Sequence, residues 1–343
     1  MDSLTQIVLG AAVGEVVLGK KAGNRAPLWG AIAGTIPDLD VFVKFFVDDL
    51  RANELHRGFS HSIVFCLIAA PFLGYLIHLI YKKKALASWR NWTMLSFWAF
   101  FTHPLLDAHT TWGTQLFWPF DLRIAYKNIS AVDPLYTLPF LLLLLIVLFM
   151  RRTSPWRRKL TWLGIAISTS YLVYTIGLKF HVDRVFKSQL AYNEIPYTRY
   201  THQPTIMNSF LWQVTAETDS AYHIGVYSIL DENQDIEFWS YPKNLILRDI
   251  LINDYTPYVQ RLANLSDGWF LLESQDGKYV FRDLRFGQIS FGANKEDVVF
   301  AYNILVQSEE WSVEQIDPPR DKMRSSIAAL FHRVKGNKEP LTP

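Results

Sequence analysis

The uneven distribution of apolar residues constrains the fold of this chain more than any other feature of its sequence. Half of its 343 residues are hydrophobic, and they concentrate before residue 181. A helix that crosses a bilayer needs about 20 apolar residues, and about 17 is the lower limit. Four stretches reach or approach this length, at residues 63–81, 92–108, 135–150 and 160–180. We therefore predict an α-helical integral membrane domain over residues 1–180.

Two weaker apolar segments precede these four stretches. Residues 4–18 have no positive charge before them, so we interpret them as a retained helix rather than a cleaved signal. Residues 26–46 contain Pro37 and two carboxylates in their middle. Irregular backbone is tolerated at membrane depth only where it packs within protein or lines a polar cavity. We expect short helices or a re-entrant turn in this segment.

Basic clusters predict the orientation of the spans, because such clusters stay on the cytoplasmic side of a membrane. They lie at three places: Lys20, Lys21 and Arg25; Lys82, Lys83, Lys84 and Arg90; and Arg151, Arg152, Arg157, Arg158 and Lys159. This pattern predicts a multi-pass protein of the cytoplasmic (inner) membrane. It also places the region after residue 180 outside the cytoplasm.

The region after residue 180 has the pattern of a soluble domain. We expect residues 181–208 to form a linker or connecting helix, residues 209–317 a β-rich (α+β) domain, and residues 318–343 a polar tail. Residues 245–262 suit a helix, and Asp276-Gly277 suits a hairpin turn. Period-two alternation predicts strands at residues 210–214, 222–230, 269–273, 278–283, 286–291 and 298–306.

Composition excludes two classes of function. The net charge is only +2, and no basic stripe with interleaved aromatic residues is present, so we expect no nucleic-acid partner. The single cysteine, Cys66, lies within an apolar stretch. One cysteine can form neither a disulfide within the chain nor a thiolate metal site.

Polar groups stand at the end of the second strong apolar stretch. The sequence HPLLDAHTTWGTQLFWPF begins at His103 and includes Asp107 and His109. Ionisable groups next to lipid are costly and are rarely left without a partner. His103 and Asp107 are four residues apart, so a helix presents both on one face, although Pro104 favours a kink or a helix end. A buried histidine satisfied by one aspartate is an equally open alternative.

Two further segments offer partners for these groups. The sequence PDLD supplies Asp38 and Asp40, and alternate residues of an extended segment face the same way. The sequence HRGFSHS supplies His56 and His61, which a turn near Gly58 followed by a capped helix would bring inward. Taken singly, the first segment could be a solvated turn and the second a basic surface loop.

Together these residues form the donor set of a metal site. Histidine nitrogens and carboxylate oxygens suit zinc, manganese or iron, and we expect a divalent metal, zinc first, as one or two ions. Arg57 and Arg123 could hold a phosphate, although Arg123 fits the membrane rim equally, and His109 could orient a ligand. Glu15 is expected to pack or reach the interface rather than bind metal. The predicted metal ligands are Asp38, Asp40, His56, His61, His103 and Asp107.

The start MDSLTQIVLGAAVGE and the motifs PDLD, HRGFSHS and HPLLDAHTTWGTQLFWPF resemble the YdjM/DUF457 family over about residues 1–180. Its members are inner-membrane proteins described as metal-dependent hydrolases, and some are named LexA-binding. The resemblance implies that the six predicted ligands match the family's motif positions. The family often has histidine near the sixth position, where this chain has Gln6, so a ligand role is not carried over to that position.

The leading hypothesis is a membrane-bound metal-dependent hydrolase of phosphoesters, derived from lipids, at the outer face of the cytoplasmic membrane. Asp38, Asp107 and Arg57 would act in catalysis, with one carboxylate as a general base. The partners would then be the lipid bilayer and a lipid or phosphoester substrate. Two alternatives stay open: a non-catalytic membrane regulator or scaffold with a structural metal, and a transporter whose ionisable groups line a pathway.

Overall fold

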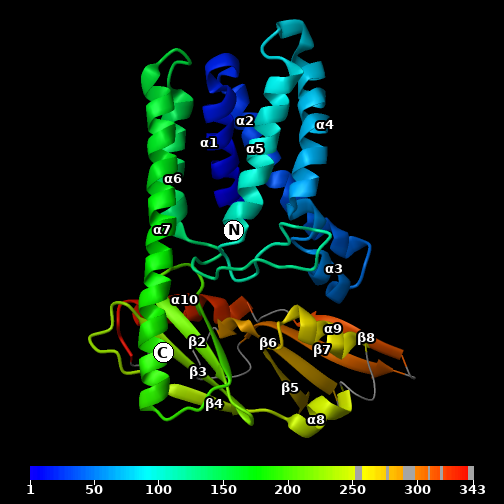
Figure 1. Ribbon diagram of the computed structural model, residues 1–343, viewed down its shortest axis with the longest axis vertical. Helices are drawn as coiled ribbons and strands as arrows, with labels where there is room; N and C mark the ends of the chain where they lie inside the picture. Colours follow the sequence, from blue (N-terminus) through cyan, green and yellow to red (C-terminus); the bar gives the residue numbers. More distant parts are fainter. Residues whose placement is uncertain (252–256, 276–277, 289–297, 308–309, 317–319, 339–343) are drawn as a thin grey trace. The chain divides into compact units, whose positions relative to one another are not determined.

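A helical region and a β-rich region follow one another along the chain in the computed structural model (Figure 1). The structure describes residues 1–251, 257–275, 278–288, 298–307, 310–316 and 320–338. One compact unit comprises Met1–Val43, Leu55–Gly177 and Ile206–Asn208, and the other comprises Lys44–Glu54, Leu178–Thr205 and Ser209–Pro343. The predicted fold class, a helical membrane-type domain followed by a β-rich α+β domain, is confirmed.

The first unit is built from helices. Among the described residues, three helices are long and apolar enough to cross a membrane, and a shorter apolar helix, α6, spans Pro134–Phe149. The three are α1 (Ser3–Ala22), α4 (Ile63–Tyr81) with its 3-10 extension η3 (Lys82–Lys84), and α7 (Pro155–Tyr192). Helix α5 (Trp89–Asp107) is rich in aromatic residues and completes the bundle beside α4. The predicted break near Pro37 appears as a short helix, α2 (Arg25–Thr35), followed by the 3-10 helix η1 (Ile36–Phe45).

Helices α1 and α2 form a hairpin whose backbones touch. Both helices carry glycines four residues apart, Gly10 and Gly14 on α1 and Gly30 and Gly34 on α2. A Cβ built on Gly30 would lie 2.1 Å from the carbonyl oxygen of Gly10, and one on Gly14 would lie 2.3 Å from that of Ala26. Only glycine allows this approach, which is the way small residues pack helices in membranes. The hairpin thereby holds the start of η1, and with it Asp38, against α1.

The HRGFSHS segment leads directly into α4. Its residues Phe59–His61 form the short 3-10 helix η2, and Ser62 caps α4 by accepting a hydrogen bond from the Phe65 backbone N–H at 3.0 Å. Residues 108–133, which follow α5, pack against this segment: the Gln115 N–H donates to the Arg57 carbonyl at 3.0 Å. The motif residues are therefore fixed by backbone hydrogen bonds on both sides.

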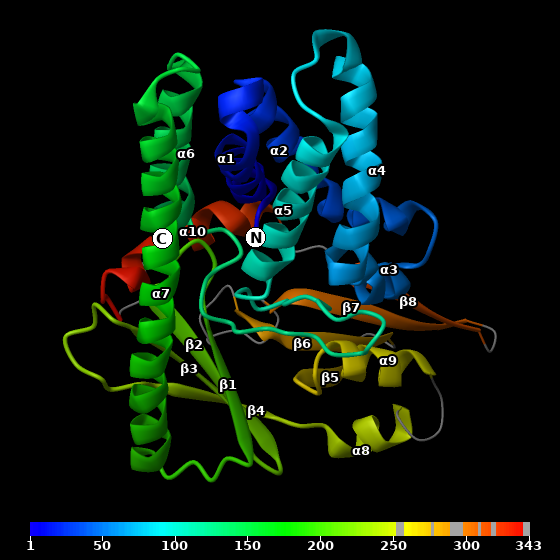
Figure 2. The same cartoon turned by 45° about the horizontal axis from the view of Figure 1, so that its top comes forward.

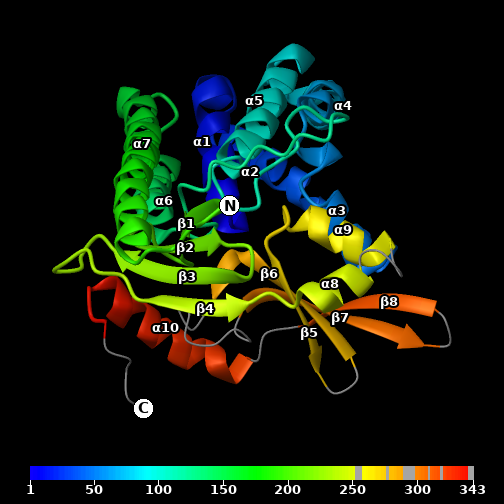
Figure 3. The same cartoon turned by 60° about the horizontal axis from the view of Figure 1, so that its bottom comes forward.

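The described part of the second unit contains two antiparallel four-stranded sheets (Figure 3). The first sheet packs on the end of α7, where Val182 and Phe186 contact Trp212 in a buried cluster. The second sheet packs on α9 (Pro257–Leu265) and on the short helix α3 (Asp49–Leu55) through Leu50. The strands of the first sheet are β1 (Arg199–Pro204), β2 (Leu211–Glu217), β3 (Ala221–Ser228) and β4 (Phe238–Pro242); those of the second are β5 (Phe270–Gln275), β6 (Lys278–Gln288), β7 (Val298–Gln307) and β8 (Glu310–Ile316).

Several elements of this unit differ from the sequence-based expectation. Helix α7 continues to Tyr192, as the connecting helix predicted within residues 181–208 would, but strand β1 then forms in the same segment, where no strand was predicted. Helix α10 (Arg320–Val334) forms in the segment predicted as a polar tail, and its Leu330 is buried. The helix predicted at 245–262 is two helices, α8 (Leu245–Asp249) and α9. The predicted Asp276-Gly277 turn and residues 289–291 lie outside the described residues.

Candidate metal centre

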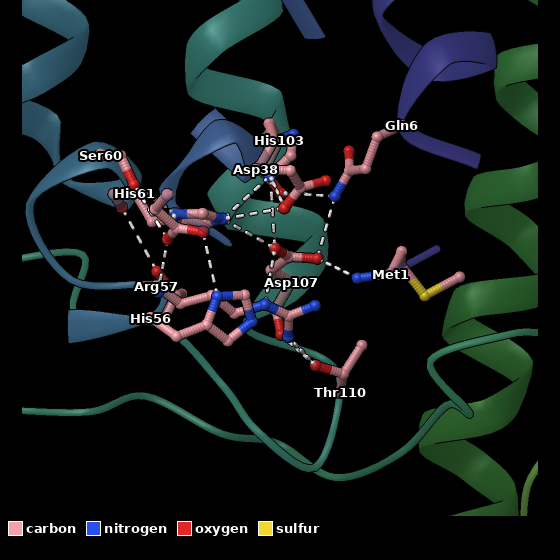
Figure 4. Close-up of polar contacts among 12 residues, drawn as sticks. Met1, Gln6, Asp38, His56, Arg57, Ser60, His61, His103, Asp107 and Thr110 are labelled. Carbon is pink, nitrogen blue, oxygen red and sulfur yellow. Dashed lines mark hydrogen bonds and ion pairs between the residues drawn. The ribbon is translucent and has the colours of Figure 1, made fainter. Parts of the chain in front are cut away.

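Four predicted ligands meet at one end of the helical unit (Figure 4). Asp38 comes from η1, His61 from η2, and His103 and Asp107 from the last two turns of α5. One ligand atom of each lies within 4.8 Å of all the others. Pro104 does not end α5, so His103 and Asp107 keep the helical spacing that presents both on one face.

Five of the six distances among the four ligand atoms lie between 3.1 and 3.4 Å. His61 Nε2 and His103 Nε2 are 3.1 Å apart. His61 Nε2 lies 3.4 Å from Asp38 Oδ1 and 3.3 Å from Asp107 Oδ2, and His103 Nε2 lies 3.4 Å from each of the same two oxygens. Zinc–ligand bonds of about 2.0–2.1 Å give a tetrahedral edge of about 3.3–3.4 Å. The arrangement therefore has the dimensions of a mononuclear site.

The neighbours of the two imidazoles decide which ring nitrogen carries the proton. His103 Nδ1 lies 2.6 Å from the Gly34 carbonyl oxygen, which can only accept a hydrogen bond. His61 Nδ1 lies 2.9 Å from Ser60 Oγ, whose hydroxyl donates to Asp40, and 3.5 Å from the Asp40 carboxylate. Both Nδ1 atoms thus carry hydrogen when the rings are neutral, and both Nε2 atoms present lone pairs to the centre.

While both rings are neutral, four acceptor atoms therefore face one another, and none of them carries a hydrogen. His61, His103 and Asp107 have fully buried side chains, and the Asp38 side chain is 15% exposed. Within the described part of the chain, Asp107 Oδ2 accepts no hydrogen bond, although the Arg57 Nε lies 3.2 Å away. Buried acceptors without donors are costly, and a cation between them removes that cost. The residues present thus fit a divalent metal.

Asp40 and His56 lie beside this group rather than in it. One Asp40 oxygen is 3.0 Å from His56 Nδ1, and the other accepts hydrogen bonds from the Arg57 backbone N–H at 2.8 Å and from Ser60 Oγ at 3.2 Å. Asp40 also faces the protonated Nδ1 of His61. A carboxylate behind a histidine orients the ring and raises its basicity as a ligand. Asp40 has that position behind His61. His56 contacts Asp40 and not the four ligand atoms.

The second oxygen of Asp107 is held by the start of the chain. Gln6 Nε2 donates to Asp107 Oδ1 at 2.9 Å and contacts the His103 carbonyl at 3.4 Å. The amino group of Met1 pairs with the same carboxylate oxygen. Gln6, at the position where the YdjM/DUF457 family often has histidine, therefore contacts the ligand residue Asp107. Sequence reasoning left its role open because nothing in the spacing shows that α1 reaches Asp107.

Arg57 lies at the edge of the group in a left-handed backbone conformation with a φ of 57°. Its guanidinium is nearly buried, donates to Thr110 Oγ1 at 2.8 Å and stands beside Asp107. Thr110 in turn donates to the Asp107 carbonyl at 2.8 Å. Non-glycine residues in this conformation are uncommon and are enriched at functional sites. The conformation directs the Arg57 side chain towards the ligands while its N–H bonds to Asp40.

Both carboxyls on η1 are favoured as anions. Burial alone would raise the pKa of Asp38, but the imidazoles of His103 and His61 beside it hold that pKa below its usual range. Burial likewise opposes ionisation of Asp40, yet the hydrogen bond to His56 and the nearby imidazoles hold its pKa below the ordinary value. Both carboxylates are thus ionised near neutral pH, the form in which a carboxylate binds metal.

The remaining candidates lie away from the four ligand atoms. His109 Nδ1 pairs with Asn128 Oδ1 at 2.8 Å, and its ring stacks at a tilt near Tyr126. Arg123 donates to the His56 carbonyl at 3.2 Å and lies over the Trp112 ring. Glu15 forms a buried ion pair with Arg157 far from the group. Glu15 thus packs within the bundle rather than in the group of ligand atoms.

The comparisons with known proteins agree with this picture. The family model described as YdjM inner membrane protein matches residues 1–182, more than half of the chain. The chain belongs to the YdjM inner membrane protein family. A Bacillus subtilis (strain 168) member of the curated proteins, "Uncharacterized protein YfhP", is 26% identical over 234 residues, which cover 66% of this chain and 68% of that protein. No solved structure matches. The YdjM match includes all four ligand atoms and the helices that carry them.

Proposed function

We propose that this YdjM-family protein is a membrane-bound, metal-dependent hydrolase that cleaves phosphoesters. The observation that carries the proposal is the convergence of four acceptor atoms, all within 4.8 Å of one another, beside the Arg57 guanidinium. His61, His103 and Asp107 would hold the ion as buried ligands, and Asp38 would stand at the open position beside it. Zinc is the ion that two imidazoles and carboxylates suit best, with manganese and iron as alternatives. A zinc ion held there would lower the pKa of a bound water towards about 7 and polarise a phosphoryl oxygen.

The side of the site that is open to solvent determines which residues we assign to substrate binding and to proton transfer. Asp38 is the one member of the four with a partly exposed side chain, so substrate and water would approach from its side. A carboxylate at that edge can accept the proton of the attacking water as a general base. Arg57 presents a planar set of N–H donors that matches two phosphate oxygens. Thr110 and Asp107 fix the guanidinium in place before substrate binds.

A lipid-derived phosphoester is the substrate class we favour. The three basic clusters lie at the end of the helical unit opposite the metal site, where Figures 1 and 2 draw the α4–α5 and α6–α7 connections. By the positive-inside rule that end faces the cytoplasm, and the metal site then faces the outer leaflet. Lipid headgroups are the phosphoesters most concentrated at that level of a membrane.

A structural metal is the second candidate, and one observation favours it. Structural zinc sites use four protein ligands, whereas catalytic sites keep one position for water. The four converging atoms would supply all four protein ligands of such a site if Asp38 stayed bound. The chain would then be a membrane regulator or scaffold rather than a hydrolase.

Hydrolysis by the full chain in lipid nanodiscs separates the two candidates. The metal-loaded protein is offered bis(p-nitrophenyl) phosphate, a panel of phospholipids and a carboxylic ester. We expect phosphoester cleavage, and we expect Asp38→Asn to keep the metal while losing activity by about 10²–10⁴-fold. The matched control is His109→Ala, which changes a histidine outside the site. This variant should keep both the metal and the phosphoesterase activity. Metal-loaded protein that cleaves no phosphoester would overturn the hydrolase and leave the structural site.

A further inference from the structure

A second polar site lies at the opposite end of the helical unit from the metal centre. A pocket of about 1020 Å³ opens between α1 and the α6–α7 connection. Its walls come from Glu15 and Lys20 on α1, from Arg152 in the connection, and from Arg157 and Arg158 in the first turn of α7. Figures 1 and 2 show the α6–α7 connection at the end of the bundle away from the N-terminus. None of these residues takes part in the proposed metal chemistry.

The pocket carries a strong excess of positive charge. Lys20, Arg152, Arg157, Arg158 and Lys159 line it, and Glu15 is its carboxylate. Arg157 neutralises Glu15 through two hydrogen bonds, Nε to Oε1 at 2.6 Å and Nη2 to Oε2 at 2.7 Å. Among the described residues that line the pocket, no second carboxylate faces the other four cations, so they can interact with a ligand or with solvent.

The charged wall is fixed by contacts inside the protein. Arg157 is 2% exposed, and its Nη1 also donates to the Met150 carbonyl at 3.0 Å. Arg152 uses its Nε to donate to the Lys20 carbonyl at 2.8 Å, which ties the connection to the end of α1. Because this bond uses Nε, the two terminal NH₂ groups of the Arg152 guanidinium can still donate hydrogen bonds to a ligand. Arginine forks held in this way suit the oxygens of a phosphate.

Aromatic residues place the pocket at the level of lipid headgroups. Trp162 lines it and is 48% exposed, and Trp156 is 59% exposed with Lys159 Nζ at 4.9 Å from its ring centre. Exposed tryptophans at helix ends mark the membrane interface. The first turn of α7 adds the positive end of a long helix dipole. Basic pockets between spanning helices are a known way to hold anionic headgroups.

We propose that this pocket binds the phosphate group of an anionic membrane lipid. The shared chemistry, a phosphate held by Arg152, Arg158 and Lys159, could also take a soluble phosphate compound. The lipid is the occupant we favour, because the pocket combines fixed cations with exposed tryptophan at the bundle end. Its size accommodates a headgroup together with the glycerol that follows it. Binding there would tie the α6–α7 connection to the end of α1.

The test is native mass spectrometry of the full chain released from nanodiscs that mix phosphatidylglycerol with phosphatidylcholine. We expect phosphatidylglycerol to be retained in preference to phosphatidylcholine. The variant Arg152→Gln/Arg158→Gln/Lys159→Gln should lose affinity by about fivefold for each cation removed. The matched control, Lys82→Gln/Lys83→Gln/Lys84→Gln, removes three cations from η3 at the same end without touching the pocket. It should retain the lipid and keep the thermal unfolding midpoint of the wild type. The pocket variant also loses the Arg152–Lys20 hydrogen bond, so its helix content, measured by circular dichroism, should match that of the wild type before lipid retention is compared.

Each other outcome contradicts part of the proposal. An equal loss in both variants would mean that the lipid responds to overall charge and not to this pocket. No loss in the pocket variant would place the lipid elsewhere. A third arm adds inorganic phosphate and glycerol 3-phosphate: if these bind the wild type and phosphatidylglycerol does not, the ligand is soluble and the lipid assignment fails. These readouts do not depend on metal content or hydrolysis.

Discussion

The two ends of the helical unit bury charged groups in opposite ways. At one end, Glu15 is buried and satisfied by Arg157 through two hydrogen bonds. At the other end, His61, His103 and Asp107 are buried with acceptor atoms 3.1–3.4 Å apart. In the first arrangement both carboxylate oxygens of Glu15 accept hydrogen bonds. In the second, among the described residues, Asp107 Oδ2 accepts none.

This difference teaches how to distinguish a structural charge from a binding site. A buried ion pair that satisfies itself holds helices together, and its sequence signature is one acidic and one basic residue in apolar surroundings. Buried acceptor atoms that converge on one point with no hydrogen between them indicate a ligand that supplies positive charge there. The four predictions that follow test the contrast, beginning with the largest expected effect.

The largest effect should come from breaking the complete pair. Arg157→Met leaves Glu15 buried without a partner and should lower the free energy of unfolding by about 3–5 kcal/mol. Denaturant unfolding of the full chain in detergent micelles measures it. The double variant Glu15→Leu/Arg157→Met removes both charges and should recover most of the loss, since apolar replacement of such a pair is often neutral or stabilising. If Arg157→Met left the free energy of unfolding unchanged, the Glu15–Arg157 pair would not be a structural ion pair, and the contrast with the metal centre would fail.

The next effect concerns the hairpin that supports the metal end. Gly30→Ala forces a Cβ to within 2.1 Å of the Gly10 carbonyl oxygen, so α1 and α2 must separate. We expect a loss of about 1–3 kcal/mol in the free energy of unfolding, and weaker metal binding because the Gly34 carbonyl orients His103. Gly177→Ala on α7 is the matched control, since nothing lies within 4 Å of its added Cβ. Equal effects of the two substitutions would contradict the close crossing.

The third effect tests the carboxylate behind His61. Asp40→Asn keeps the shape of the side chain but removes the negative charge that faces the His61 Nδ1 hydrogen. Metal affinity, measured by competition with a chromophoric chelator, should fall by about 10–100-fold. Asp121→Asn changes an exposed carboxylate of the 108–133 segment and should leave affinity unchanged. If Asp40→Asn bound metal as tightly as the wild type, Asp40 would not orient the site.

The smallest effect is also the most revealing for the comparison. With all metal chelated, His61→Ala removes one of the facing acceptors and should leave the unfolding midpoint unchanged or slightly higher than that of the wild type. Arg157→Met, at the complete end, should be destabilised under the same conditions. Thermal unfolding with and without chelator measures both. A strongly destabilised metal-free His61→Ala would mean that the acceptors satisfy one another without a cation.

Apolar stretches were sufficient to predict the helical region, because continuous apolar runs of 16–21 residues are close to the length of a membrane-spanning helix. The α1–α2 crossing was missed, although Gly10, Gly14, Gly30 and Gly34 are visible in the sequence. Their spacing indicates close helix packing only once the two helices are known to face each other. Strand β1 was missed because its sequence, RYTHQP, has no apolar alternation and ends in proline.

The site was predictable as a set of motifs but not as a coordination shell. The spacing of His103 and Asp107 places both on one helix face, and the structure keeps them there. Neither the Asp38–Asp40 pair nor the His56–His61 pair shows from sequence which member reaches the centre. That choice depends on the 3-10 geometry of η1 and on the left-handed turn at Arg57. Gln6 and Ser60 contribute through contacts that no local pattern reveals.

The most direct test of the central claim is the metal content of the purified full chain, measured by inductively coupled plasma mass spectrometry. We predict one divalent ion per chain in the wild type, its loss in His61→Ala, and its retention in His109→Ala. Wild-type protein that binds no divalent ion after exposure to zinc, manganese and iron would contradict the account. Equal metal loss in the His61 and His109 variants would contradict it as well.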